Sequence, residues 1–457
     1  MPAERLYYAD SALTHFTATV TDIRERSRTG SASLWQIALD RSAFYPTSGG
    51  QLHDTGTLIA TAPSGARLEA PIVDVEEDEH GELWHLTQKP LLAGTQIEGR
   101  IDRARRIDHM QQHSGQHLLS ALFYRELHTP TVSFHLGDAV STIDLQTDAL
   151  APSALADALG NIEQLANDIV AEGRPVVLRT VSAANAESLL ADGTLRKLPP
   201  RAGDIRLIVI SGSPAAGAIA GNSAGATAGN PDHASSADLD VNACGGTHVA
   251  STSQIGAVLL RGTERIRQSV RVSFLCGNRA IAAARADDAL LTQLGREFSV
   301  GRAHLSPTLA RIKAEMRTSA KERQALREDL ANYHASRLLV EDPPHDDLRI
   351  VRRIFPDRDA DYVKLLASRL ISAAPHTAAL LASTQQPDAP ATVVFGCSQE
   401  LGRNAGEMLR AALAPAGGRG GGSATLAQGL VPAENLAAAL DGLESALRAK
   451  PVSSVSA

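Results

Sequence analysis

Two short segments that lie far apart in the chain each carry a pair of residues able to bind a metal ion. The first is Asp108-His-Met-Gln-Gln-His-Ser-Gly-Gln-His-Leu-Leu119, in which His113 and His117 are four residues apart. If this segment is helical, the two imidazoles lie on one face and can reach the same ion. Such pairs also occur on helices that bind no metal, so the second segment is needed to interpret the first.

The second segment is Asn242-Ala-Cys-Gly-Gly-Thr-His-Val249, which holds Cys244 and His248 at the same spacing. Gly245 and Gly246 lie between them and allow the backbone to turn sharply. Together the two segments offer one sulfur and three nitrogen ligands, a set that suits zinc and does not suit calcium or magnesium. A fold that uses both segments must bring them together around one ion.

Both segments resemble the split zinc site of the alanyl-tRNA synthetase editing domain and of the free-standing AlaX trans-editing proteins. Those proteins hydrolyse tRNA(Ala) wrongly charged with serine or, in some members, glycine. Three further parts of the chain resemble the glycine-rich motif, the middle strands and the DHHA1 domain of the same proteins. They are Ala43–Gln51 followed by Asp54 and Gly56, Ser133–Gly137 with Thr142–Leu145, and Gly417–Gly422 with Ala427–Gly429. The resemblance covers nearly the whole chain, and it is best for the long form of AlaX, which has no aminoacylation core.

A third histidine, His109, lies one turn before His113 on the same expected face. Three histidines at this spacing span about 12 Å of helix, too far for all of them to bind one ion. The resemblance assigns the ligand roles to His113 and His117, together with Cys244 and His248. His109 is then expected to pack or to form hydrogen bonds.

Two other classes of hydrolase do not fit the sequence. A zincin needs glutamate directly after the first histidine of the pair, where Ser114 stands, and an inverted zincin needs glutamate before the second, where Gln116 stands. A metallopeptidase would therefore lack its general base. Phosphoesterases that share the DHHA1 domain carry an Asp-His-His motif, which this sequence does not contain.

Length and composition predict a protein of several domains that is not inserted in a membrane. The 457 residues exceed what one hydrophobic core usually holds. No apolar run approaches the roughly 20 residues that span a bilayer, and the N-terminus lacks a signal-peptide pattern. The cysteines are only Cys244, Cys276 and Cys397, which is not a disulfide framework. We expect a soluble, cytoplasmic protein.

The net charge of −7 means that any RNA-binding surface must be a local basic patch. Two clusters of arginines are possible patches, and a solvated surface is the alternative interpretation of both. They are Arg100, Arg103, Arg105 and Arg106, and Arg261, Arg265, Arg267 and Arg271.

We expect an α+β multidomain fold with four parts. Residues 1–100 show short strands separated by turns and should form a small β-barrel. Residues 101–280 should form the editing domain, with an antiparallel sheet and a central helix at 101–128. Its segment 211–237 is low in complexity and is expected to be a mobile insertion. Residues 281–345 show helical spacing typical of a hairpin or coiled coil, and 346–457 alternate strands and helices as in an α/β domain.

Further site residues follow mainly from the resemblance. It favours a substrate-binding loop near the editing pocket for Gly49, Gly50 and Gln51, although an ordinary turn explains two glycines equally well. The residues expected to contact the amino acid are Thr247, His135 and Ser133. The run from Gly417 to Gly422 would be a flexible linker by composition alone. Its resemblance to the DHHA1 domain implies instead that this region contacts tRNA, through Gly418, Arg419, Gly420 and Gln428.

The sequence therefore predicts a trans-editing hydrolase that deacylates mischarged tRNA(Ala) with zinc as cofactor. Zinc can activate water and polarise an ester carbonyl without help from a carboxylate base. Four protein ligands would fill a tetrahedral site, however, and full sites are usually structural. A non-catalytic tRNA-binding module with a structural zinc is thus the alternative. A homodimer through the helical and C-terminal segments is also expected.

Overall fold

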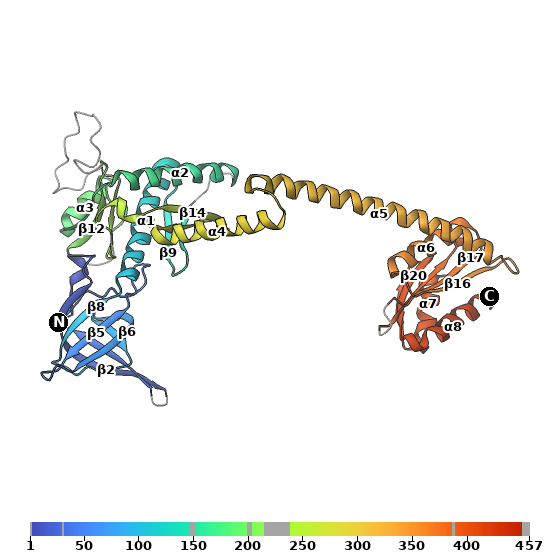
Figure 1. Ribbon diagram of the computed structural model, residues 1–457, viewed down its shortest axis with the longest axis horizontal. Helices are drawn as coiled ribbons and strands as arrows, with labels where there is room; N and C mark the ends of the chain where they lie inside the picture. The colour runs from blue at the N-terminus through green and yellow to red at the C-terminus, as the bar shows by residue number, and fades with distance from the viewer. Residues whose placement is uncertain are drawn as a thin grey trace, which may run out of the picture. The chain divides into compact units, whose positions relative to one another are not determined.

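The computed structural model describes residues 2–29, 32–146, 152–198, 203–213, 238–385 and 389–449. The chain divides into two compact units, 1–293 and 294–457, which we describe separately (Figure 1). From residue 214 onward, the insertion expected at 211–237 lies outside the described residues. Among the described helices, none is long and apolar enough to cross a membrane.

The first unit begins with a closed β-barrel, drawn in blue in Figure 1. In barrel order the strands are β2 (His15–Thr29), β3 (Ala32–Leu39), β7 (Leu83–Thr87), β6 (Arg67–Glu77), β5 (Gly56–Thr61) and β8 (Gln96–Ile101). Side chains alternate between the two faces of a strand, and the apolar ones that face inward, such as Val20, Ile37 and Leu58, form the core. The small N-terminal β-barrel expected from the sequence is confirmed.

The N-terminal residues form a short edge beside the barrel. Strand β1 (Glu4–Arg5) pairs in parallel with β4 (Arg41–Ser42), and the 3-10 turn η1 (Leu6–Tyr8) follows. Tyr7 of this turn is buried against Tyr45, with the two rings edge to face at 5.2 Å. The turn is thereby held next to the loop that contains the glycine-rich motif.

Helix α1 (Arg103–Leu127) starts directly after the barrel, and Asp102 caps its N-terminus. It is the central helix expected from the sequence. From Met110 onward most of its side chains are buried, because other elements of the unit surround it on several sides. Buried polar side chains of the helix form hydrogen bonds within the unit, as Gln112 does with the backbone of Cys276 and Ser114 with the backbone N–H of Val249.

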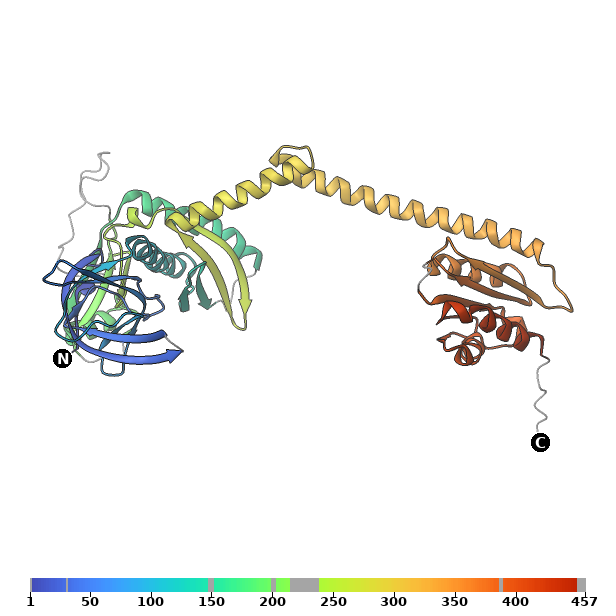
Figure 2. The same ribbon diagram turned by 60° about the horizontal axis from the view of Figure 1, so that its bottom comes forward.

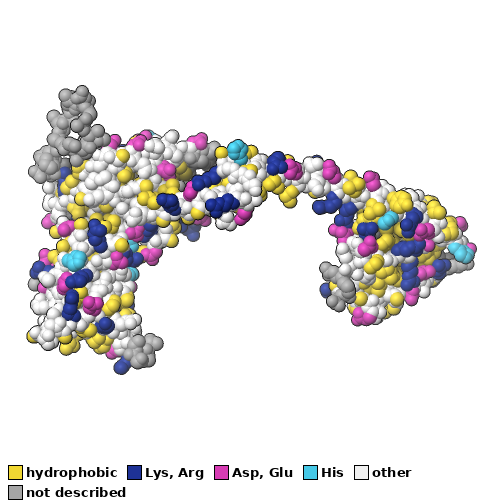
Figure 3. Space-filling view, viewed as in Figure 1, with side chains coloured by type: hydrophobic (Ala, Val, Ile, Leu, Met, Phe, Trp, Pro, Cys, Tyr) yellow, Lys and Arg dark blue, Asp and Glu magenta, His cyan; other side chains and the backbone are white. Residues whose placement is uncertain are grey.

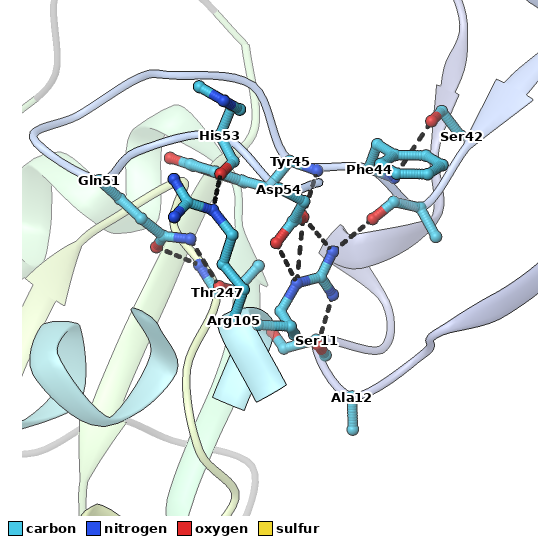
Figure 4. A network of polar contacts seen from close by, with 12 residues as sticks. Ser11, Ala12, Ser42, Phe44, Tyr45, Gln51, His53, Asp54, Arg105 and Thr247 are labelled. Atoms are coloured by element: carbon cyan, nitrogen blue, oxygen red, sulfur yellow. Dashed lines mark hydrogen bonds and ion pairs between the residues drawn. The ribbon is translucent and has the colours of Figure 1, made fainter. Parts of the chain in front are cut away.

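Arg106 ties the first turn of α1 to the barrel through Asp54, which is labelled in Figure 4. Its guanidinium donates hydrogen bonds to both carboxylate oxygens of Asp54 and to the backbone oxygens of Ser11 and Ala43. The side chains of Arg106 and Asp54 are both 0% exposed. Asp54 also accepts the backbone N–H of Tyr45 at 2.7 Å. The buried pair therefore fixes the barrel loop between residues 43 and 54 against the start of α1.

Two antiparallel sheets complete the first unit. The four-stranded sheet has the order β14 (Val258–Ile266), β15 (Ser269–Cys276), β10 (Ser141–Gln146) and β9 (Thr131–Leu136), and the three-stranded sheet has the order β11 (Val176–Val181), β12 (Ile205–Ile210) and β13 (Asp240–Ala243). The helical elements are α2 (Pro152–Glu172), α3 (Ala183–Ala191), η2 (Thr252–Ile255) and α4 (Gly277–Glu297). One hydrophobic core joins α1, α2 and both sheets, where the sequence predicted a single antiparallel sheet.

The second unit contains a five-stranded sheet with helices on both faces (Figure 2). The strands run in the order β16 (Arg349–Phe355), β17 (Thr377–Ser383), β18 (Ala391–Cys397), β20 (Leu426–Val431) and β19 (Arg419–Gly422). Helix α6 (Ala360–Ala373) and the end of α5 (Leu305–Glu341) cover one face, and α7 (Ala405–Leu413) and α8 (Leu436–Arg448) cover the other. The α/β domain expected near the C-terminus is confirmed.

The glycine run near the C-terminus is an edge strand and not a linker. A side chain on Gly420 or Gly429 would meet Leu413 of α7, with Cβ to Cδ1 distances of 3.0 and 2.3 Å. A side chain on Gly406 of α7 would lie 2.6 Å from the backbone oxygen of Gly422. The glycines are therefore needed because α7 packs directly on the backbone of β19 and β20.

Candidate functional site

His113 and His117 of α1 meet Cys244 and His248, which flank the turn that follows β13. One ligand atom from each of the four side chains lies within 4.8 Å of all the others. Cys244 Sγ is 3.4 Å from His113 Nε2 and 3.3 Å from His248 Nε2. Bonds of about 2.0–2.3 Å in a tetrahedral zinc site place neighbouring ligand atoms about 3.5 Å apart. The structure thus brings the four predicted ligands together at the spacing of a metal site.

The other ring nitrogens of the two α1 histidines are held by oxygen acceptors. His113 Nδ1 donates to Gln51 Oε1 at 2.8 Å, and His117 Nδ1 donates to Asp240 Oδ2 at 3.1 Å. A carbonyl or carboxylate oxygen accepts but does not donate, so each imidazole carries its proton on Nδ1. The Nε2 atoms of both residues therefore face the cluster, as in protein metal sites with oriented histidine ligands.

The turn that carries Cys244 admits only glycine at position 246. A side chain there would place Cβ 2.2 Å from His113 Cε1 and 3.1 Å from Gln51 Oε1. Arg206 Nη1 donates to the backbone oxygens of Cys244 and Gly246, at 2.9 and 2.8 Å, and so holds the turn from its outer side. The position of the thiol is set by these contacts and by the strand before it.

Electrostatics favour a thiolate at Cys244. Burial opposes ionisation, but the imidazoles of His113 and His248 outweigh it and hold the pKa of the Cys244 thiol well below its ordinary value. Burial, helped by His113, lowers the pKa of His248 to about 3. Burial also opposes a charge on His117, but the hydrogen bond to Asp240 and the nearby Cys244 raise its pKa to about 9. Metals bind thiolates and neutral imidazoles, so binding must displace a proton from His117.

One ring nitrogen of the cluster lacks a partner in the described part of the chain. His117 Nε2 is buried and forms no hydrogen bond. Leaving a buried polar atom unpaired usually costs about 1–3 kcal/mol, and coordination to a metal ion would remove that cost. Together with the three-nitrogen, one-sulfur donor set, this atom shows that the residues fit a metal ion.

The glycine-rich loop reaches the cluster through Gln51. Gly49 and Gly50 have left-handed backbone conformations, with φ of 56° and 80°, and a side chain on Gly50 would meet the ring of Phe134. Gln51 Nε2 donates to Thr247 Oγ1 at 2.8 Å, and the backbone N–H of Thr247 donates back to Gln51 Oε1 at 3.2 Å. Gln51 and Thr247 are thus placed beside the cluster, where they bond to each other.

Ser133 and His135 lie on the opposite side of β9 from the cluster. Phe134, between them, faces inward, with its ring centroid 5.9 Å from that of His113. Ser133 and His135 are exposed, and Ser133 donates to Asp144 at 2.6 Å. Their expected contact with the amino acid stays a prediction that this placement does not support.

His109 is not part of the cluster. Its side chain is 4% exposed, and in the described part of the chain neither ring nitrogen has a hydrogen-bond partner. Burial lowers its pKa to about 4, with the charge of Arg105 adding to the effect. The residue packs inside the unit, which is one of the two roles expected for it.

Most of the arginines considered as RNA contacts are paired with acidic side chains. Arg106 is buried and is not part of a surface patch, contrary to that expectation. Others form ion pairs, namely Arg100 with Glu98, Arg105 with Asp138, Arg261 with Asp287 and Arg271 with Asp144. On the face shown in Figure 3, basic and acidic side chains are interspersed. The residues expected to contact tRNA in the second unit lie on β19 and β20 or just before them, namely Gly418, Arg419, Gly420 and Gln428.

Sequence reasoning missed the groups that orient the histidines. Asp240 and Asn242 lie at alternate positions before Cys244, and residues at this spacing in a strand share one face. That alternation was a usable signal for a carboxylate beside the site. Ser114, whose Oγ is 3.3 Å from His248 Nδ1, gave no comparable signal, because its partner lies in a distant segment.

Comparison with known proteins finds two domain families in the chain. The threonyl and alanyl tRNA synthetase second additional domain matches residues 232–271, a range that includes Cys244 and His248. The DHHA1 domain matches residues 349–449, which form most of the second unit. The two matches confirm the resemblance seen in the sequence for these parts of the chain.

Relatives with curated functions are alanine–tRNA ligases. That of Methanosarcina acetivorans is 28% identical over 435 residues, which are 93% of this chain and 42% of the ligase. That of Pyrococcus furiosus is 30% identical over 335 residues, 71% of this chain and 31% of the ligase. The solved C-Ala domain of Aquifex aeolicus alanyl-tRNA synthetase is 26% identical, covers 22% of this chain and 96% of that domain, and has a TM-score of 0.20. The chain spans less than half the length of these ligases.

Proposed function

We propose that this chain hydrolyses the ester bond of mischarged tRNA(Ala). It carries the second additional domain of threonyl and alanyl tRNA synthetases and a DHHA1 domain, and it is homologous to alanine–tRNA ligases. The domain content is consistent with an AlaX-type editing protein. The substrates are tRNA(Ala) carrying serine and, secondarily, glycine. The metal is zinc, because thiolates and imidazoles are its usual types of ligand.

The observation that carries this proposal is the convergence of the four donor atoms on one point. A zinc ion bound there would supply Lewis acidity to an ester carbonyl and to water. Gln51 and Asp240 hold the protons of His113 and His117 on Nδ1, so both Nε2 atoms stay available as ligands. No carboxylate base is then required for hydrolysis.

Access to the cluster is restricted to one side. The side chains of His113, His117 and His248 are buried, whereas Cys244 is partly exposed. An aminoacyl ester therefore approaches past the Cys244 turn, and the buried histidines keep bulk water from the other sides. Exclusion of water strengthens electrostatic stabilisation of the charge that develops on the carbonyl oxygen.

Recognition of serine requires a polar group near its hydroxyl. A site that hydrogen-bonds a substrate hydroxyl discriminates strongly against an analogue without one. Thr247 is the best placed of the three residues considered for this role, because it lies directly between Cys244 and His248 in the chain and its hydroxyl accepts a bond from Gln51. We expect serine to be released faster than glycine.

A second function is favoured by one specific feature. Four protein ligands fill a tetrahedral zinc site, and filled sites are usually structural. On that basis the alternative is a tRNA-binding module that does not catalyse hydrolysis. In both cases the second unit would contact the tRNA through β19 and β20, and α5 would mediate self-association through exposed apolar side chains such as Leu309, Met316 and Leu326.

The decisive experiment measures deacylation of Ser-tRNA(Ala), Gly-tRNA(Ala) and Ala-tRNA(Ala) by the zinc-loaded wild type and by Cys244→Ala. Cys397→Ala is the matched control, because that thiol is buried in the core of the second unit. We expect rapid release of serine by the wild type and the control, and none by Cys244→Ala. Serine release that survives loss of Cys244 would contradict a metal-centred mechanism. No release by a zinc-loaded wild type that still binds tRNA would favour the binding module.

A further inference from the structure

A pocket of about 280 Å³ opens beside Cys244. Its walls come from the N-terminal turn, the barrel loop that contains Gly49, strand β12 and the Cys244 turn. Of the four cluster residues, only Cys244 lines it. Its volume is near the lower end of the range of about 300–1,000 Å³ typical of small-molecule sites. The pocket is therefore the approach from solvent to the metal cluster.

Aromatic rings and guanidinium groups form much of the wall. The ring of Tyr7 lies edge to face with Tyr8 and Tyr45, at centroid distances of 5.0 and 5.2 Å. The guanidinium groups of Arg206 and Arg5 lie 5.3 and 5.6 Å from the centroid of Tyr8. Unstacked bases of RNA ends bind to aromatic rings and to guanidinium planes, and guanidinium groups also attract phosphates. This combination suits a nucleotide.

Two polar atoms of the same wall have no partner in the described part of the chain. They are Tyr7 Oη and Arg206 Nη2, and both are buried. Tyr7 is only 1% exposed, and an unpaired hydroxyl at that depth destabilises the free protein. A ligand with oxygen acceptors, such as the hydroxyls of a ribose, would satisfy these donors. Arg206 also holds the Cys244 turn, so this one side chain contacts both the pocket and the turn that carries the thiol of the cluster.

We propose that this pocket is the subsite for the terminal nucleoside of the aminoacyl-RNA, with the base against Tyr8 and the ribose hydroxyls near Tyr7. The inference rests on the proposed function, in which the scissile ester joins the amino acid to that ribose. With the nucleoside in the pocket, the ester lies on the Cys244 side of the cluster. The pocket then determines which end of the substrate enters first.

The test uses a non-hydrolysable probe, 3′-seryl-amino-3′-deoxyadenosine, and the full chain loaded with zinc. Binding is measured by calorimetry for the wild type, Tyr8→Ala and Tyr7→Phe. Tyr8→Ala should weaken binding about 5- to 150-fold, the usual effect of removing one base-stacking ring. Tyr7→Phe should weaken it about 3- to 10-fold, the usual value of one hydrogen bond. Tyr333→Ala, at an exposed tyrosine of α5, is the control and should bind as tightly as the wild type.

Stability separates recognition from a purely structural role. Tyr7→Phe removes a hydroxyl that has no partner in the described structure, so its urea midpoint should equal or exceed that of the wild type while the probe binds more weakly. Binding of the probe within twofold of wild type by both pocket variants would overturn the subsite, even if the wild type deacylates Ser-tRNA(Ala). Probe binding that depends on Tyr8 in a protein without deacylase activity would support the subsite and contradict the proposed function.

Discussion

Replacing Asp54 by alanine should strongly destabilise the β-barrel. The change removes the carboxylate that pairs with Arg106 and leaves that guanidinium buried, with both side chains 0% exposed in the wild type. The backbone oxygens of Ser11 and Ala43 still accept from Arg106, but its Nε and one Nη2 hydrogen lose their partner. Removing one member of a fully buried pair costs about 3–5 kcal/mol, and we expect a loss in that range.

Urea unfolding followed by tryptophan fluorescence measures this loss. The chain has two tryptophans, Trp35 in β3 and Trp84 in β7, so the signal reports on the barrel. Glu98→Ala is the matched control, since Glu98 pairs with Arg100 on the exposed side of the same barrel, and its midpoint should hardly change.

A double variant tests the cause of the loss. Asp54→Leu combined with Arg106→Met replaces the ion pair by apolar side chains, so no charge stays buried without a partner. It should be more stable than Asp54→Ala, because apolar replacement of a whole buried pair is often neutral. If Asp54→Ala lost less than about 1 kcal/mol, or if the double variant were the less stable of the two, the reasoning about buried charge would be refuted.

Three further outcomes are expected. Asp240→Ala should weaken zinc binding about 10- to 100-fold in a competition titration with a coloured chelator, because His117 loses the oxygen that orients it. An unchanged zinc affinity would argue against an orienting role of Asp240. Gly246→Ala should abolish zinc binding, since its Cβ would lie 2.4 Å from His113 Nδ1, and full metal content by atomic emission would show that the turn adapts. Burial lowers the pKa of His85 from 6.5 to about 4, so the unfolded chain takes up this proton first as the pH falls. The stability that neutral His85 contributes is complete above about pH 6.5 and decreases by up to about 3 kcal/mol towards pH 4. The urea midpoint of His85→Gln should therefore depend less on pH in this window than that of the wild type. An equal pH dependence of the two midpoints would exclude His85 as the source.

Short-range patterns in the chain were sufficient to predict much of the fold. Helical spacing predicted α1, and the alternation of strands with turns predicted the barrel. These patterns are readable because one turn of helix or one pleat of a strand involves only neighbouring residues. Low apolar content marked the stretch from 211 to 237 for the same reason, although most of that prediction lies outside the described residues.

The roles of several polar residues depended on contacts between distant segments. Arg106 belonged to an apparent basic cluster, but packing of the barrel loop against α1 buries it with Asp54. Gln51 was expected to contact substrate, yet it holds His113 and Thr247. By composition alone Gly420 belonged to a flexible linker, but it is part of strand β19, on which α7 packs closely.

The sequence by itself determined which donor atoms the candidate metal site of this protein offers. The identity of the donor atoms sets metal preference, and a spacing of four on a helix sets which imidazoles share a face. Only the tertiary structure decided that His117 pairs with Asp240, and that solvent reaches the cluster beside Cys244. The physical reason is that local geometry follows from neighbouring residues, whereas burial and the direction of a lone pair depend on how remote segments pack.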